Sequence, residues 1–281
     1  MSGVDLHLPQ LRPMGKTMRT DRWWIQPLLV FLGFSAFIIY STWAAFQAKH
    51  FYFDGGGAHY LSPFYSPLFF DPVGVHSGHA WFGEAPNWLT GLFPSFIGFS
   101  PAFLILWAPG GFRFTCYYYR GAYYKAFWAD PISCSVGEPG FRGKKYRGEA
   151  KLPLILQNVH RYFLYLAIVF IFLLAYDAIV AFKFTEGGVT RFGIGVGTLV
   201  LLINPILLGS YTFGCHSFRH LIGGRKDEMG EGATKKAYDC VSCLNRRHML
   251  CAWMSLFWVG FTDVYVRMCS MGKWHDFHYI F

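Results

Sequence analysis

Five apolar runs divide this chain, and each is long enough to form a helix that crosses a lipid bilayer. Such a helix needs about 20 apolar residues to span roughly 30 Å of hydrocarbon. No water is available there to satisfy backbone polar groups, so the runs are restricted to structures that bond their own backbone, such as helices. The predicted spans are Gln26–Gln47, Gly91–Arg113, Pro153–Phe182, Phe192–Ile222 and Leu244–Met268.

The second run is the least regular of the five. Pro101 breaks it, and Pro109-Gly110-Gly111 predicts a stop, because proline lacks a backbone donor and glycine is a poor helix former. An aromatic stretch, FRFTCYYYRGAYYKAFW, follows and predicts a continuation into the interface, where Tyr and Trp rings are favoured. The expected fold is an all-α membrane protein, a five-helix transmembrane bundle forming one domain over residues 1–281.

The composition agrees with a membrane location. Hydrophobic residues make up 53% of the chain and charged residues only 15%, which excludes an ordinary soluble domain. The net charge of +9 does not indicate nucleic-acid binding, because the basic residues lie in the connections between apolar runs and not along one face.

The basic residues also predict an orientation in the cell membrane. With the N-terminus in the cytoplasm, 20 of the 25 Lys and Arg residues lie inside, and only Lys49, Lys183, Arg191, Arg267 and Lys273 lie outside. The positive-inside rule favours this arrangement, which puts the C-terminus outside. The long outer loop from His50 to Asn87 is expected to fold against the bundle as an irregular cap.

Cysteine and histidine gather at the cytoplasmic end of these predicted spans. A polar side chain at membrane depth is unfavourable unless it finds a partner, so several in one layer indicate a functional site. A lone buried His is more often hydrogen-bonded, and Cys often behaves as a small hydrophobe, as we expect for Cys251 and Cys269. The gathered residues are Cys116, Cys134, His160, Cys215, His216, His220, Cys240, Cys243 and His248.

This mixture of thiols and imidazoles indicates a metal centre. Haem b needs two imidazoles on opposed helices, whereas paired Cys and His suit zinc or a Rieske-type [2Fe–2S] cluster. Zinc carries no electrons, so a redox protein would use the cluster, with the redox site toward the cytoplasmic face. The preferred ligands are Cys116, Cys215, His160, His220 and His248, and the rivals are Cys134, Cys240, Cys243 and His216.

The strings NVHRYFLY, GCHSFRH and LNRRHML with SLFWVGFTDVYVR resemble a known family. They are similar to the single-chain membrane anchor of succinate dehydrogenase or fumarate reductase, respiratory complex II, in its actinobacterial form. The resemblance implies an anchor that docks a flavoprotein and an iron–sulfur subunit, receives electrons from succinate and reduces a quinone, expected to be menaquinone. The resemblance also implies that the chain is a subunit of succinate dehydrogenase and that it does not itself act on succinate.

One departure from the family's dihaem members is informative. Those anchors place an axial His on each of the first four helices, but the first span here has no His inside it, and the second offers Cys116 instead. The ligands of a distal haem are therefore missing, which favours the iron–sulfur centre. A haem b anchor of the same complex remains the alternative. A zinc-stabilised assembly factor or a transporter is the alternative of another class.

The quinone needs an apolar slot and donors for its two carbonyl groups. Aromatic and basic side chains near the cytoplasmic interface could supply them, or could equally form an aromatic belt with snorkelling arginines. The predicted quinone residues are Tyr117, Tyr119, Arg120, Arg161 and Trp253. Asp177 and Asp263, inside the third and fifth spans, are expected either to lead protons to the quinone or to pair with a donor such as Arg267.

Overall fold

Four long helices form the centre of the molecule. The structure is a computed structural model that describes residues 22, 24–94, 98–120, 155–224, 228 and 230–281. Within these residues, four helices are long and apolar enough to cross a membrane. They are α1 (Ile25–Gln47), α6 (Ile155–Val180), α7 (Val196–Phe213) and α10 (His248–Ser270), and they overlap the first, third, fourth and fifth predicted spans.

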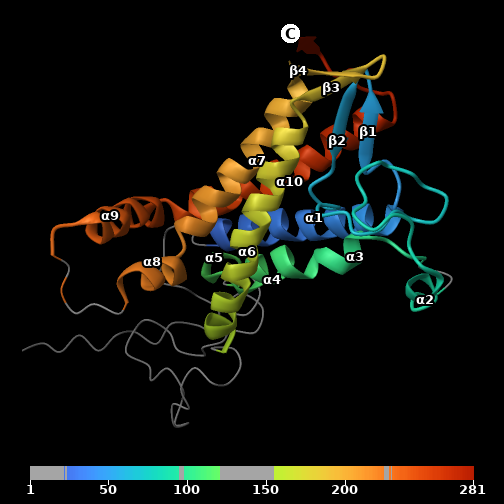
Figure 1. The fold of residues 1–281 in the computed structure, drawn as a ribbon. Helices are drawn as coiled ribbons and strands as arrows, with labels where there is room; N and C mark the ends of the chain where they lie inside the picture. Colours follow the sequence, from blue (N-terminus) through green and yellow to red (C-terminus); the bar gives the residue numbers. More distant parts are fainter. Residues whose placement is uncertain (1–21, 23, 95–97, 121–154, 225–227, 229) are drawn as a thin grey trace, which may run out of the picture.

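The four helices pack as neighbours and leave apolar surface on the outside (Figure 1). Helix α7 packs against both α6 and α10, while α1 packs against α10. Ile39 on α1 and Phe172 on α6 are 70% and 69% exposed, although both are large and apolar. No charged residue falls within α1 or α7. Exposed apolar surface on long uncharged helices is what a bundle surrounded by lipid requires.

The second predicted span is not one helix. After α2 (Asn87–Thr90), the segment contains two short helices, α3 (Ala102–Ile105) and α4 (Trp107–Thr115). The break at Pro101 is confirmed, because Pro101 is the cap before α3. The predicted stop at Pro109 is wrong: α4 runs through it, since Pro109 lies in the first turn, where no backbone donor is needed. The count of five spans therefore remains a prediction.

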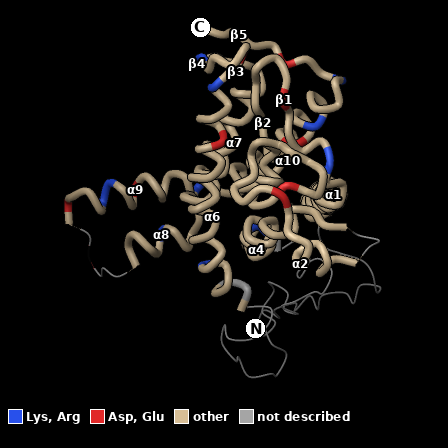
Figure 2. The backbone as a smooth tube through the Cα atoms, turned by 45° about the vertical axis from the view of Figure 1, so that its right-hand side comes forward, with Lys and Arg blue, Asp and Glu red and all other residues tan. Residues whose placement is uncertain are grey.

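The molecule is mostly helical, but the prediction of an all-α fold is wrong, because the structure also contains strands. Strands β1 (Tyr52–Gly55) and β2 (Ala58–Leu61) form an antiparallel hairpin in the predicted irregular cap. A second antiparallel sheet has the order β3–β4–β5 and gathers beside the C-terminus (Figure 2). These strands escaped prediction because they are short and border apolar runs. They are β3 (Lys183–Glu186), β4 (Val189–Gly195) and β5 (His278–Ile280).

The ends of the last two predicted spans also differ from the prediction. The fourth run begins as strand β4, becomes helix α7 and then stops, and a separate helix α8 (His216–Gly223) follows. The fifth run begins in helix α9 (Ala233–Arg246) and breaks at Arg247 before α10 starts. Helices α8 and α9 pack on one another and lie to one side of the bundle, away from the strands (Figure 1). We call the end with the strands the cap end and the opposite end, with Cys116 and Cys215, the cysteine end.

Candidate metal centre

Both predicted cysteine ligands lie where a helix is interrupted. Cys116 follows the last residue of α4 and has an extended backbone, with φ −64° and ψ 136°. Cys215 precedes the first residue of α8 and has nearly the same conformation, with φ −68° and ψ 141°. A new helix follows each cysteine directly, α5 (Tyr117–Arg120) after Cys116 and α8 after Cys215. Two similar helix breaks therefore present the two thiols.

A histidine side chain contacts each thiol. The Nε2 atom of His160, in the second turn of α6, lies 3.1 Å from the Sγ atom of Cys215. The Nε2 atom of His248, the first residue of α10, lies 3.8 Å from the Sγ atom of Cys116. All four residues are buried, with exposed fractions between 1% and 6%. Segments far apart in the sequence thus bring two thiols and two imidazoles into one buried layer.

Neighbouring side chains hold both imidazoles in place. The Oγ1 atom of Thr115 lies 2.8 Å from the Nδ1 atom of His160, and the same hydroxyl donates to the carbonyl oxygen of Gly111. A hydroxyl has one proton, so this network assigns the proton of His160 to Nδ1, and the Nε2 atom that faces Cys215 then carries the lone pair that a ligand atom needs. Phe112 stacks on His160 at 4.7 Å between ring centroids, and Tyr211 stacks on His248 at 5.0 Å.

The four residues line one cavity of about 540 Å³. Tyr117 and Arg161, predicted to bind quinone, line the same cavity, as do His216 and His220. The last two are one helical turn apart on α8, with 3.1 Å between their Nε2 atoms. Burial, with smaller effects of His220 and Arg219, lowers the pKa of His216 below its usual value. The two α8 histidines thus face one another in the same cavity.

The remaining predicted residues lie elsewhere. Cys240 and Cys243 are exposed on α9, so the CxxC pair does not enter the buried layer. Tyr119 is fully buried and donates to the carbonyl oxygen of Ala252 at 2.6 Å, and Trp253 lines a separate groove between α1 and α10. Cys134 and the side chain of Arg120 lie outside the described residues. The predicted quinone residues therefore do not surround one pocket.

The two thiols and two imidazoles can be compared with the number of ligands that each kind of metal centre requires. A structural zinc ion collects four ligands around one point. The part of the chain that the structure describes contains no group of three or more His, Cys, Asp or Glu side chains arranged around a single ion. A two-iron cluster needs only two ligands on each iron, and two buried thiols with two buried imidazoles supply that number. Burial also raises the pKa of the Cys215 thiol to about 11, so a metal ion must displace a proton to bind there.

Several residues around the site were not singled out from the sequence. Thr115 orients His160, Tyr211 stacks on His248, and the guanidinium of Arg113 lies 5.3 Å from the centre of the Tyr211 ring. Arg113 was detectable, because a charge at the edge of an apolar run is a functional candidate. Thr115 and Tyr211 carry no such signal.

Comparison with known proteins identifies the family. A family model described as "Actinobacterial succinate dehydrogenase subunit SdhC" matches residues 25–272. Among solved structures, the chain is similar to one titled "Mycobacterium smegmatis Sdh1 complex in the apo form", with 40% identity over 96% of each chain and a TM-score of 0.75. No curated protein sequence gives a match. The chain therefore belongs to the actinobacterial succinate dehydrogenase SdhC family and is the membrane-anchor subunit of a succinate dehydrogenase complex.

Proposed function

We propose that this anchor holds a Rieske-type [2Fe–2S] centre between the succinate-oxidising subunits and a membrane quinone. The observation that carries the proposal is the pair of contacts between Cys116 and His248 and between His160 and Cys215 in one buried cavity. A Rieske-type centre takes two thiolates on one iron and two imidazoles on the other. The donor set at this site matches that requirement in type and number.

Four of the five predicted ligands are supported by their surroundings. His220 is exposed and faces His216, whereas His160 and His248 are buried and each contact a thiol. We therefore assign Cys116, Cys215, His160 and His248 as ligands and leave His220 outside the set. A bound cluster would supply a one-electron carrier at this position.

The chain's own residues prepare the site for such a carrier. Thr115 fixes the tautomer of His160, as outer hydrogen bonds commonly do for metal-bound histidines. The stacked rings of Phe112 and Tyr211 restrict the rotation of the two imidazoles. The groups that surround a metal centre also influence its redox potential.

The proposed direction of electron flow follows from the family and the charge distribution. A flavoprotein and an iron–sulfur subunit dock at the cysteine end, which faces the cytoplasm in the orientation predicted by the positive-inside rule. A bound centre would carry electrons from succinate toward the quinone one at a time. The quinone, taken to be menaquinone, accepts two electrons and two protons to become the quinol.

The test is metal analysis and electron paramagnetic resonance of the purified complex. We expect non-haem iron and acid-labile sulfide beyond the content of the soluble subunits, with a [2Fe–2S] signal assigned to the anchor. The single variants Cys116→Ser, Cys215→Ser, His160→Ala and His248→Ala should lose this signal. The matched controls Cys240→Ser and His220→Ala should keep it.

The other outcomes decide between the alternatives. A sharp α-band in the reduced visible spectrum would establish a haem b anchor, and zinc without iron would establish a structural metal site. Full quinone reductase activity in a complex whose anchor contains no iron would also contradict the proposal.

A further inference from the structure

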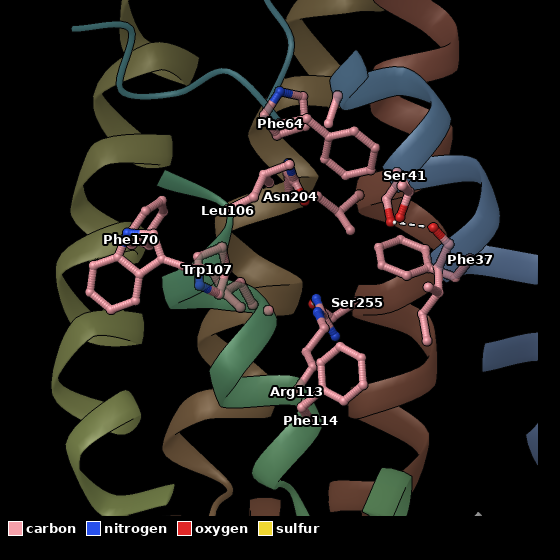
Figure 3. A pocket seen from close by; sticks show the side chains of 18 of the residues that line it. Phe37, Ser41, Phe64, Leu106, Trp107, Arg113, Phe114, Phe170, Asn204 and Ser255 are labelled. Atoms are coloured by element: carbon pink, nitrogen blue, oxygen red, sulfur yellow. Dashed lines mark hydrogen bonds between the residues drawn. The ribbon is translucent and has the colours of Figure 1, made fainter. Parts of the chain in front are cut away.

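Two histidines that the proposed centre does not use lie together on α8. The side chains of His216 and His220 are exposed, with 3.1 Å between their Nε2 atoms and 4.6 Å between their ring centroids. Both line the cavity of the metal centre and also a smaller cavity of about 300 Å³, which α9 borders through Tyr238. Neither lines the cavity inside the bundle, where Arg113 and Ser255 lie among apolar side chains (Figure 3). The pair is therefore reached from water and not from the apolar interior.

The distance between the two Nε2 atoms is the one that a metal ion held by both imidazoles requires. Two histidines one helical turn apart share a face and bind zinc together in other helical sites. With metal–nitrogen distances of about 2.0–2.1 Å, nitrogens 3.1 Å apart subtend an angle of roughly 95–102° at the ion. This angle lies between the roughly 90° of a square-planar or octahedral site and the roughly 109° of a tetrahedral one.

Without an ion, the same contact is a hydrogen bond between the two rings. One Nε2 atom then carries a proton and donates it to the other, whose own proton is on Nδ1. An ion instead takes the lone pairs of both Nε2 atoms, and both rings then carry their proton on Nδ1. The first ring only changes its tautomer, so the pair can exchange its hydrogen bond for a metal ion without losing a proton.

The helix that carries the pair is held in place on several sides. Helix α8 packs against α9 and α6. The guanidinium of Arg219, between the two histidines in the sequence, lies 4.7 Å from the centre of the Tyr238 ring on α9. The carbonyl oxygen of His220 accepts from the backbone nitrogen of Gly224 at 2.8 Å, which closes the last turn of α8. Less freedom is then lost when an ion binds, because the two ligands already lie at the required spacing.

The ligand atoms determine which kind of ion the pair selects. Imidazole nitrogen suits zinc, copper and nickel, whereas Ca²⁺ and Mg²⁺ require oxygen ligands. Among the described residues, no carboxylate lines either of the two cavities that the pair borders. Water would therefore fill the remaining positions around the ion. Arg219 lines the smaller cavity, and its positive charge should limit the affinity for a cation.

We propose that His216 and His220 form a second metal site, which binds a divalent transition-metal ion such as Zn²⁺ at the edge of the cavity of the metal centre. The site uses none of the four ligands assigned to the [2Fe–2S] centre, so it does not rest on the proposed function. It also differs from the ligand set predicted from the sequence, in which His220 belonged to the cluster and His216 was a rival.

The test is a calorimetric titration of the intact purified complex with Zn²⁺ near neutral pH. Losing an outer partner of a metal ligand already weakens binding about 10–100-fold, so losing a ligand should weaken it at least about tenfold. We therefore expect His216→Ala and His220→Ala each to reduce the affinity by at least that factor. Cu²⁺ bound to the parent complex should also show, by electron paramagnetic resonance, hyperfine splitting from two nitrogen nuclei, which both variants should lose.

Controls separate this site from its rivals. Leu221→Ala, an exposed position on the same helix, and His275→Ala, an exposed histidine near the C-terminus, should bind Zn²⁺ as the parent does, and dye reduction by the soluble subunits measures the amount of intact complex. Unchanged affinity in both histidine variants would overturn the site, as would binding that only Cys240→Ser/Cys243→Ser removes. Loss of the [2Fe–2S] signal in His216→Ala would assign that histidine to the centre and would also overturn a separate site. A parent complex without any [2Fe–2S] signal would refute the proposed centre and leave the Zn²⁺ result unaffected.

Discussion

Asp263, buried near the cap end of α10, provides the sharpest test of how this bundle is held together. Its carboxylate is fully buried and accepts from Tyr40 on α1 and from Ser62 beside the β1–β2 hairpin, both at 2.5 Å. Arg267, one turn further along α10, pairs with the same carboxylate at 3.3 Å and donates to the carbonyl oxygen of Lys49 at 2.8 Å. One carboxylate therefore joins α1, α10 and the cap.

Replacing Asp263 by leucine should destabilise the anchor strongly. The substitution leaves Arg267, which is 2% exposed, as a buried cation without its partner, and breaking a buried pair in this way costs about 3–5 kcal/mol. For a chain of roughly this size, about 2–4 °C of melting temperature is lost per kcal/mol, so the midpoint should fall by roughly 6–20 °C. The control Asp239→Asn breaks an exposed pair with Lys235 and should cost less than about 1 kcal/mol.

The double variant Asp263→Leu/Arg267→Met decides whether the reasoning is correct. Removing both charges should recover much of the loss, because the unpaired cation accounts for most of it. Thermal unfolding of the purified complex, followed by far-ultraviolet circular dichroism, measures all four proteins. A midpoint for Asp263→Leu within 2 °C of the Asp239→Asn control, or a double variant no more stable than the single one, would refute the argument.

Two further predictions concern the metal centre. Thr115→Val removes the 2.8 Å contact with His160 Nδ1, so a chelator should remove iron about 10–100-fold more readily from this variant. Thr115→Ser keeps the hydroxyl and should behave as the parent protein. Equal iron retention in the two variants would contradict the assigned role of Thr115. Burial raises the pKa of Cys215 from its ordinary value of 9.0 to about 11, so the folded metal-free protein keeps a proton that the unfolded chain releases. This thiol should therefore contribute roughly 3 kcal/mol of stability that is fully present below pH 9 and is lost as the pH rises to 11. Denaturant titrations of the metal-depleted complex test the prediction: above pH 9, the loss of stability should be smaller by about this amount in Cys215→Ala than in the parent protein.

The long apolar runs determined four of the helices from the sequence alone. Lipid leaves no alternative to internal backbone bonding, so α1 and α6 appear close to the predicted bounds without any knowledge of their neighbours. The sequence also indicated the family, through characteristic strings that lie near the ends of these helices. For Asp263, the sequence allowed a pairing with Arg267, and the structure shows it.

Only the tertiary structure decided how the polar side chains meet. The extended conformations at Cys116 and Cys215 have no hydropathy signal, yet they place each thiol beside a particular imidazole and leave His220 with His216. The strands at the cap end and the pairing of Arg113 with Ser255 depend on contacts between distant segments. Hydropathy is a local property that determines which segments enter the membrane, whereas the partners of a buried donor or ligand depend on how those segments pack.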